Sequence, residues 1–133
     1  MNDLYREEIL EHWQNPLNFG VMRGADLVVD QVNPLCGDEL TLFFKINKGK
    51  IADISFIGNG CAISIASASI LSDNVKGKSV RTVSKLIGDD VLEMLGGPVA
   101  PARLKCAFLA LEALRKVTNM SELPAKQATN LNE

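Results

Sequence analysis

Two stretches of alternating apolar and polar residues constrain the fold more than any other feature of this 133-residue chain. In residues 39–46, every second side chain is apolar, namely Leu40, Leu42, Phe44 and Ile46. Residues 51–58 repeat the pattern, with one face expected to carry Ala52, Ile54 and Phe56. The turn-forming sequence NKGK (47–50) separates them, so the pair is predicted to be a β-hairpin. With a further strand at 27–33, the sequence predicts a three-stranded antiparallel sheet.

From Cys61 onward the sequence pattern becomes helical. Helices are predicted at 61–75, 79–87, 89–96 and 104–117, with one more ahead of the strands at 3–14. Strands followed by helices predict an α+β domain over residues 1–118, a small three-stranded antiparallel sheet covered on one face by helices. Residues 119–133 are polar and are predicted to form a disordered tail.

The composition excludes several classes of function. Lys and Arg total 14 and Asp and Glu total 16, and the basic residues are scattered, which argues against a nucleic-acid surface. No apolar run approaches the ~20 residues of a membrane span, and the acidic N-terminus lacks the apolar centre of a secretory signal. Three cysteines, an odd number, favour free thiols in a reducing compartment. We therefore expect a cytoplasmic protein without nucleic-acid or membrane partners.

The three cysteines all occupy predicted ends of elements. Cys36 lies in a turn with Asp38 two residues ahead, Cys61 starts a helix after residues 58–60, and Cys106 lies in the first turn of the last helix. Unpaired N–H groups at a helix start favour thiolate over thiol. Thiolates with a carboxylate are ligands for Zn²⁺ or iron–sulfur iron. The pattern favours a shared site at one sheet edge; the alternative is that each cysteine fills the core as a small hydrophobe.

Two of the predicted helices carry further candidates. Lys105, Glu112 and Lys116 form a polar stripe on the last predicted helix, and Cys106 falls beside it. Its thiol is therefore expected near the surface, with the Lys105 ammonium close by; the alternative for Lys105 is a solvated surface lysine. The helix beginning at Cys61 is rich in small residues, and Ser64, Ser67 and Ser69 are expected to permit close packing without chemistry.

Four segments together resemble one known family. NPLCGDELTL, GNGCAISIASASIL and PARLKCAFLALEAL resemble the three cysteine motifs of the U-type iron–sulfur cluster assembly scaffolds, the IscU, SufU and NifU N-terminal group. YREEILEHWQNPLNFG resembles their opening helix and turn. The resemblance runs in order from about Leu4 to Val117 and implies the SufE/NifU-like fold, which agrees with the α+β prediction.

The resemblance also implies a function and a set of site residues. Cys36, Cys61 and Cys106 match the cluster- or zinc-ligating cysteines, and Asp38 matches the aspartate that tunes cluster lability and can itself ligate. The implied protein is a scaffold or carrier rather than an enzyme. It accepts sulfur from a cysteine desulfurase, builds a labile [2Fe-2S] cluster with iron and electrons from a donor such as a ferredoxin, and passes it to acceptor apoproteins. Cys106 is the expected sulfur acceptor.

Two departures keep a second reading open. IscU-type scaffolds carry a histidine before the third cysteine, where this chain has Lys105, and its single histidine, His12, is expected to be structural or exposed. The Hsp70-binding segment of IscU is replaced by VAPAR (99–103). Both departures resemble SufU, a zinc-bound sulfurtransferase that takes persulfide sulfur from the desulfurase and stimulates it. In that alternative Lys105 is a thiolate-activating or coordinating neighbour. SufU nevertheless carries an extra segment between its second and third cysteines, for which the interval from Cys61 to Cys106 is too short.

Overall fold

The predicted sheet is present. The structure is a computed structural model that describes residues 3–35 and 37–121, so Cys36 and residues 122–133 lie outside the described residues. Three antiparallel strands pair in the order β1-β2-β3. They are β1 (Leu27–Asn33), β2 (Asp38–Asn47) and β3 (Lys50–Asn59).

The β2–β3 hairpin contains an irregularity that the alternation did not reveal. Lys48 and Gly49 both have positive φ, 54° and 75°, as a tight two-residue hairpin turn requires. The register then shifts between Lys45 and Ile46, which is a β-bulge. The inserted residue is Ala52, which is left without a partner between Ile51 and Asp53, and it reverses the faces of the β3 residues that precede it. As a result Ile51 is buried, whereas Ala52 is exposed, and the prediction that Ala52 faces the core is wrong.

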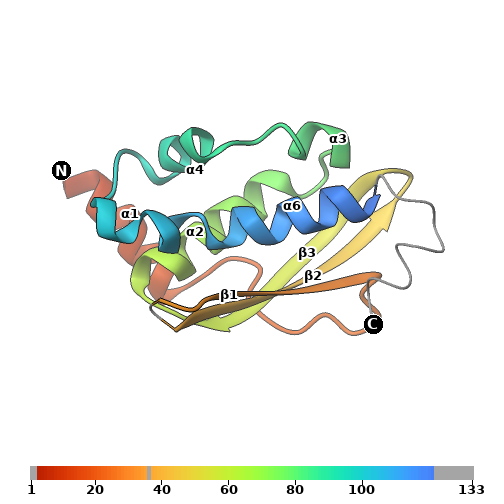
Figure 1. Ribbon diagram of the computed structural model, residues 1–133, viewed down its shortest axis with the longest axis horizontal. Helices are drawn as coiled ribbons and strands as arrows, with labels where there is room; N and C mark the ends of the chain where they lie inside the picture. The colour runs from red at the N-terminus through yellow and green to blue at the C-terminus, as the bar shows by residue number, and fades with distance from the viewer. Residues whose placement is uncertain (1–2, 36, 122–133) are drawn as a thin grey trace.

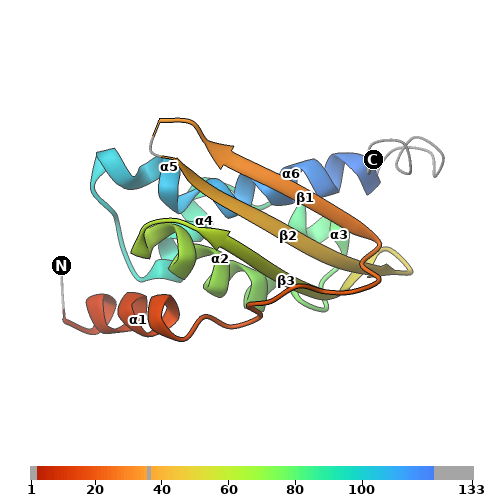
Figure 2. The ribbon, with the colours of Figure 1, turned by 90° about the horizontal axis from the view of Figure 1, so that it is seen from below.

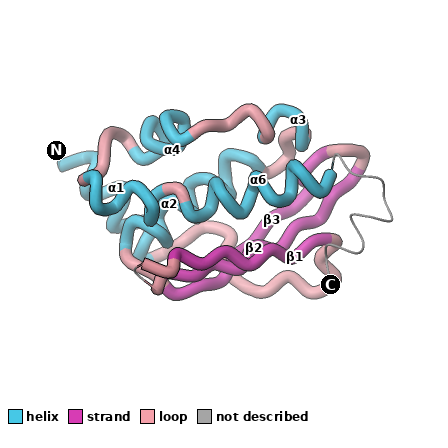
Figure 3. The backbone as a smooth tube through the Cα atoms, in the orientation of Figure 1, coloured by secondary structure: helices cyan, strands magenta, loops and turns pink. Residues whose placement is uncertain are grey.

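The helices cover one face of the sheet, as predicted. In Figure 1, α2 and α6 lie directly over the strands and α3 and α4 lie beyond them, while Figure 2 shows the opposite face without a covering helix among the described residues. The tube in Figure 3 shows the same separation into a helical and a strand layer. The helices are α1 (Asp3–Gln14), α2 (Ala62–Val75), α3 (Val80–Val83), α4 (Gly88–Leu95), α5 (Leu104–Ala107) and α6 (Leu109–Ser121), with a 3₁₀ turn, η1 (Pro101–Arg103), before α5.

The last predicted helix is divided. Phe108, at φ −98° and ψ 1°, separates α5 from α6, although hydrogen bonds from its N–H to Leu104 O and from Glu112 N–H to its carbonyl, both 3.0 Å, bridge the break. The Phe108 ring packs so tightly on Gly88 that a Cβ there would approach it to 2.8 Å. α6 continues to Ser121, past the predicted end at 117 and into the predicted tail. Of the predicted helix 79–87, only α3 is helical.

The core lies between the sheet and the α2–α6 layer. Its largest fully buried side chains are Phe44, Phe56, Leu40, Leu42, Ile51, Ile54, Leu71, Leu95, Leu109, Leu111, Leu114 and Val75. None of the described helices is long and apolar enough to cross a bilayer.

The segment that follows α1 is held by hydrogen bonds to α2 and to the edge of β3. Ser69 Oγ accepts a hydrogen bond from Leu17 N–H at 2.8 Å and lies 2.7 Å from His12 Nδ1. The Phe56 N–H donates to Asn18 O at 2.9 Å, which places the segment along the edge strand. His12 therefore has a structural contact, which is one of the two settings predicted for it, and Ser69 holds a loop in addition to packing.

Candidate metal centre

Three ligand-type side chains from distant parts of the chain converge at one end of the sheet. The ligand atoms of Asp38, Cys61 and Cys106 all lie within 4.8 Å of one another. The elements that carry them, the start of β2, the start of α2 and α5, gather at the same end in Figure 2. The predicted convergence is present for these three residues. Cys36 lies outside the described residues, so its place in the site stays a prediction.

Strand parity and helix capping position the first two ligands. Asp38 is the first residue of β2 and pairs with Asn33, the last residue of β1. It shares the inward parity of Leu40, so its carboxylate is buried at 7% exposure on the helical side of the sheet. Cys61 is the N-cap residue of α2, with φ −73° and ψ 171°, and its sulfur is half-buried. The predicted helix start at Cys61 is confirmed.

The third ligand is more deeply placed than expected. Cys106 is 2% exposed, so the prediction that its thiol lies near the surface is wrong. The predicted stripe described one helix by itself, whereas α2 and η1 both contact α5 in the fold. Lys105 is exposed as expected and borders a cavity of about 160 Å³ together with Leu35 and Glu112. Its proposed part in the chemistry stays a prediction.

Arg103 is a site residue that the sequence analysis missed. The charge of Cys61, followed by hydrogen bonding to Cys106 and the charge of Cys106, raises the pKa of the Arg103 guanidinium, which is exposed to solvent. The cation therefore lies beside both sulfurs. The signal was available, because Arg103 precedes Cys106 by three residues, about one helical turn, and thus shares its side of the backbone.

Ser64 is the second residue missed. It is fully buried in α2, and its hydroxyl donates a hydrogen bond to Asp38 Oδ2 and lies 3.5 Å from Cys61 Sγ. The Cys61 N–H also points to Asp38 Oδ2, at 3.5 Å. Gly60 leaves room for this arrangement, because a Cβ there would lie 3.0 Å from Ser64 Cβ and 3.3 Å from Asp38 Cγ. The expectation that Ser64 serves packing alone is therefore wrong.

The donor set fits a thiophilic metal. Ligand atoms 2.0–2.3 Å from one tetrahedral ion lie about 3.3–3.8 Å apart, so a spread of 4.8 Å needs only small side-chain adjustments. Two sulfurs and one carboxylate suit Zn²⁺ or iron, whereas Mg²⁺ and Ca²⁺ prefer oxygen alone. Ionised, the three ligands carry three negative charges, which the bound metal and the nearby Arg103 guanidinium offset.

The Arg103 charge leads to a testable prediction about the reactivity of Cys61. Iodoacetate is an anion and iodoacetamide is neutral, but both alkylate the same thiolate. The alkylation rate with iodoacetate divided by the rate with iodoacetamide therefore reports the electrostatic potential at the sulfur. We expect Arg103→Ala to lower this ratio at Cys61 by about two- to five-fold, the range for one exposed ion pair. Arg103→Lys should retain most of it. Mass spectrometry of the alkylated peptide measures both rates.

Arg81 provides the matched control for that experiment. It is an exposed arginine on α3, which lies at the hairpin end of the sheet, away from the ligands. Arg81→Ala should leave the ratio unchanged. An Arg103→Ala ratio equal to that of the unmodified sequence would show that the guanidinium does not act on the sulfur.

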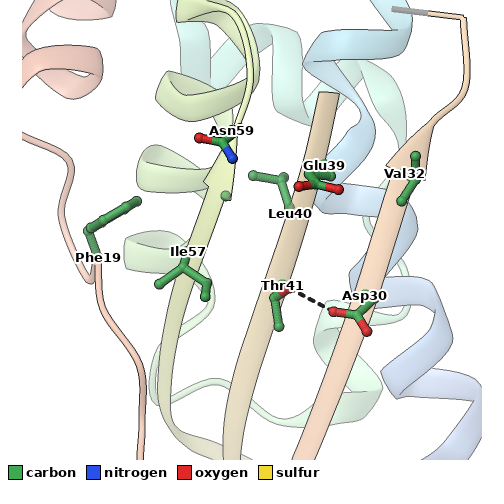
Figure 4. A pocket seen from close by; sticks show the side chains of 9 residues that line it. Phe19, Asp30, Val32, Glu39, Leu40, Thr41, Ile57 and Asn59 are labelled. Carbon is green, nitrogen blue, oxygen red and sulfur yellow. Dashed lines mark hydrogen bonds between the residues drawn. The ribbon is translucent and has the colours of Figure 1, made fainter. Parts of the chain in front are cut away.

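A separate hollow lies on the outer face of the sheet. Its volume is about 580 Å³, and Figure 4 shows the apolar Phe19, Val32 and Ile57 around it together with the carboxylates of Asp30 and Glu39. Asp30 is held there by a 2.7 Å hydrogen bond from Thr41 Oγ1. None of the described residues that line it carries a thiol, so it is distinct from the ligand cluster.

Comparison with known sequences identifies similar proteins. The profile described as NifU-like N terminal domain matches residues 4–129. The zinc-dependent sulfurtransferase SufU of Bacillus subtilis is 38% identical over 133 aligned positions, which cover 87% of this chain and 90% of that protein. The iron–sulfur cluster assembly scaffold protein IscU 1 of Archaeoglobus fulgidus is 38% identical over 113 positions, covering 85% and 73%.

The two alignments differ in their gaps. The alignment with SufU is longer than the part of this chain that it covers, so some SufU positions have no counterpart here. The alignment with IscU 1 is as long as the part of this chain that it covers. Within the aligned region, no IscU 1 position therefore lacks a counterpart in this chain, while the identity to both proteins is the same, 38%.

Solved structures share the fold. A putative iron–sulfur cluster assembly scaffold protein for the SUF system from Fervidobacterium islandicum superposes with a TM-score of 0.69 and 26% identity, covering 83% of this chain and 93% of that one. The N-terminal part of a NifU-like protein from Brucella abortus gives a TM-score of 0.70 at 22% identity, covering 91% and 97%, a likeness of fold alone.

Proposed function

Because the chain belongs to the NifU-like N-terminal domain family, as its cysteine motifs indicated, we propose that it is an iron–sulfur cluster assembly scaffold. It accepts sulfur from a cysteine desulfurase, assembles a labile [2Fe-2S] cluster and transfers the cluster to acceptor apoproteins. The observation that carries this proposal is the convergence of Asp38, Cys61 and Cys106 within 4.8 Å. Cys36 is the proposed fourth ligand.

The mixture of thiolate and carboxylate ligands suits a cluster that is bound and later released. Cysteine thiolates are the usual ligands of iron–sulfur clusters, and four of them hold a cluster firmly. A carboxylate is a harder ligand than a thiolate and binds cluster iron less tightly. Asp38, as the one carboxylate among the four proposed ligands, therefore supports loading and release of the same cluster.

Sulfur transfer requires a thiolate that attacks the terminal sulfur of the desulfurase persulfide. A new S–S bond forms on the scaffold, the S–S bond of the donor breaks, and the donor cysteine leaves as a thiolate, so no net electrons are exchanged. Reduction of the transferred sulfur to sulfide then takes two electrons from a donor such as a ferredoxin. The exposed Arg103 cation favours the approach of an anionic persulfide.

Cys106 remains the proposed final acceptor, with a condition that its burial imposes. At 2% exposure, Cys106 is reached by a persulfide donor only after a local movement of the residues around it. The half-buried Cys61 is accessible without such a movement. Alkylation of the protein before and after incubation with desulfurase and cysteine, followed by peptide mapping, locates the persulfide on one of the two.

A second function is favoured by the absence of a histidine from the described ligand cluster. The single histidine contacts Ser69 instead, and the Bacillus relative at 38% identity is a zinc-dependent sulfurtransferase. In this alternative Asp38, Cys61 and Cys106 hold Zn²⁺ together with Cys36. Bound zinc would keep the sulfurs deprotonated near neutral pH. Sulfur would then pass through the protein without cluster assembly.

Metal and acid-labile sulfide per chain, measured on anaerobically purified protein, distinguish the two functions. The measurement is repeated after adding desulfurase, cysteine, ferrous iron and a reductant. Iron and sulfide in equal amounts, absent from Cys36→Ala, are the expected result for a scaffold. One zinc that persists, with faster desulfurase turnover and no iron uptake, would instead support the sulfurtransferase. Binding of neither metal nor sulfide would overturn both.

A further inference from the structure

Ser64 touches two of the three described ligands and is not itself a ligand of the usual kind for these metals. Its hydroxyl donates to Asp38 Oδ2 and lies 3.5 Å from Cys61 Sγ, and its side chain is fully buried. A hydrogen bond from a hydroxyl to an ionised carboxylate is charge-assisted and about twice as strong as a neutral one. The contact therefore restrains the carboxylate far more than packing alone.

The other serines of α2 show that this contact is specific to position 64. Ser69 and Ser72 bond to the loop that follows α1, through Leu17 and Asn18. Ser67 is as buried as Ser64, yet its hydroxyl has no hydrogen-bond partner among the described residues. One helix thus offers four buried serines in three different settings, and Ser64 alone reaches the ligand cluster.

The surroundings of Ser64 keep the contact in place. Gly60 lies beside both partners, and a Cβ added there would come within 3.0 Å of Ser64 Cβ and 3.3 Å of Asp38 Cγ, so that one of them would have to shift. The Cys61 N–H reaches the same oxygen, Oδ2, from the helix start at 3.5 Å. Two donors on one carboxylate oxygen fix the plane of the carboxylate and so determine how it faces the two sulfurs.

We propose that Ser64 is a positioning residue that orients the Asp38 carboxylate toward the metal and so sets how tightly the site holds it. This inference rests on the proposed function, because it requires that the cluster binds metal. Residues that hold metal ligands in place typically contribute about 10- to 100-fold to metal affinity. Loss of the hydroxyl frees the carboxylate to rotate away from the sulfurs and weakens the ligand on which lability depends.

Anaerobic titration with Co²⁺, a spectroscopic substitute for Zn²⁺, tests the role. We expect Ser64→Ala to raise the Kd for Co²⁺ by about 10- to 100-fold and to change the visible absorption bands of the bound ion. Ser64→Thr keeps a hydroxyl and should restore both. Ser67→Ala removes a hydroxyl of equal burial and should match the unmodified sequence. Alanine favours helix, so Ser64→Ala is compatible with α2.

The Asp38→Ala background separates positioning from a general structural effect. If Ser64 acts through the carboxylate, adding Ser64→Ala to Asp38→Ala changes the Kd no further. An equal loss in both backgrounds would overturn the inference, as would a Ser64→Ala spectrum and Kd identical to those of the unmodified sequence. In the latter case normal Co²⁺ binding would leave the proposed function intact.

A second variant keeps the test decisive if Ser64→Ala does not fold. Gly60→Ala pushes on the Ser64–Asp38 pair without altering either residue. It should weaken Co²⁺ binding in the native background and have no effect in Asp38→Ala. Failure of the unmodified protein to bind Co²⁺ or Zn²⁺ would overturn the proposed function, and the role of Ser64 with it.

Discussion

Cys106→Ala is expected to lower the affinity for Zn²⁺ by more than about 100-fold, beyond the loss typical of a residue that only supports a ligand. The same change should abolish the retention of iron and sulfide after reconstitution. The thiol supplies one of three described ligands, and alanine offers no donor atom in its place. Competition with a chromophoric chelator measures the affinity.

Two other variants show whether the loss of affinity is specific to the ligands. Cys61→Ala should produce a loss of similar size, because both sulfurs belong to one cluster. Ser67→Ala, a buried change in the same layer, should leave the affinity unchanged. Apo Cys106→Ala should lose only about 1 kcal/mol of unfolding free energy, typical of a small substitution. Unchanged zinc affinity in a folded Cys106→Ala protein would show that Cys106 is a core cysteine and not a ligand.

The sheet was predictable because the alternation of apolar and polar residues is a local property of a strand with one buried face. Leu40, Leu42 and Phe44 face the helices as their alternation required. The failure at Ala52 has an equally local origin, the bulge opposite Lys45, but a bulge leaves no mark in a pattern of apolar residues. A single inserted residue changes the face of everything before it in the strand.

The convergence of the ligands was predictable from the sequence, whereas the burial of Cys106 was not. Cys61 and Cys106 were located by their positions at element ends, which depend on neighbouring residues in the chain. The burial of Cys106 depends on the elements that pack against α5, α2 among them, which no helical projection of α5 contains. Ser64 follows the same rule, because its contact with the ligands arises only when β2 and α2 meet at one end of the sheet. Arg103 differs, because its spacing of three residues from Cys106 was a local signal.

Phe56→Ala is expected to lower the unfolding free energy of the apo protein by about 3–5 kcal/mol, the usual loss for a large aromatic side chain deleted from a core. Phe56 is fully buried in β3, under the helical layer. The total free energy of unfolding of a small domain is about 5–15 kcal/mol, so the variant should unfold at a much lower denaturant concentration. Urea titration followed by circular dichroism measures the change.

Phe19 supplies the matched control, because it contacts the same ring from the solvent side. The two rings meet edge to face with centroids 5.3 Å apart, and Phe19 is 52% exposed. Phe19→Ala should therefore cost about 1 kcal/mol, the contribution of one aromatic pair. Equal losses in the two variants would mean that the segment around Phe19 holds the edge of β3 as firmly as the core does. A loss under about 1 kcal/mol in Phe56→Ala would contradict its place at the centre of the core.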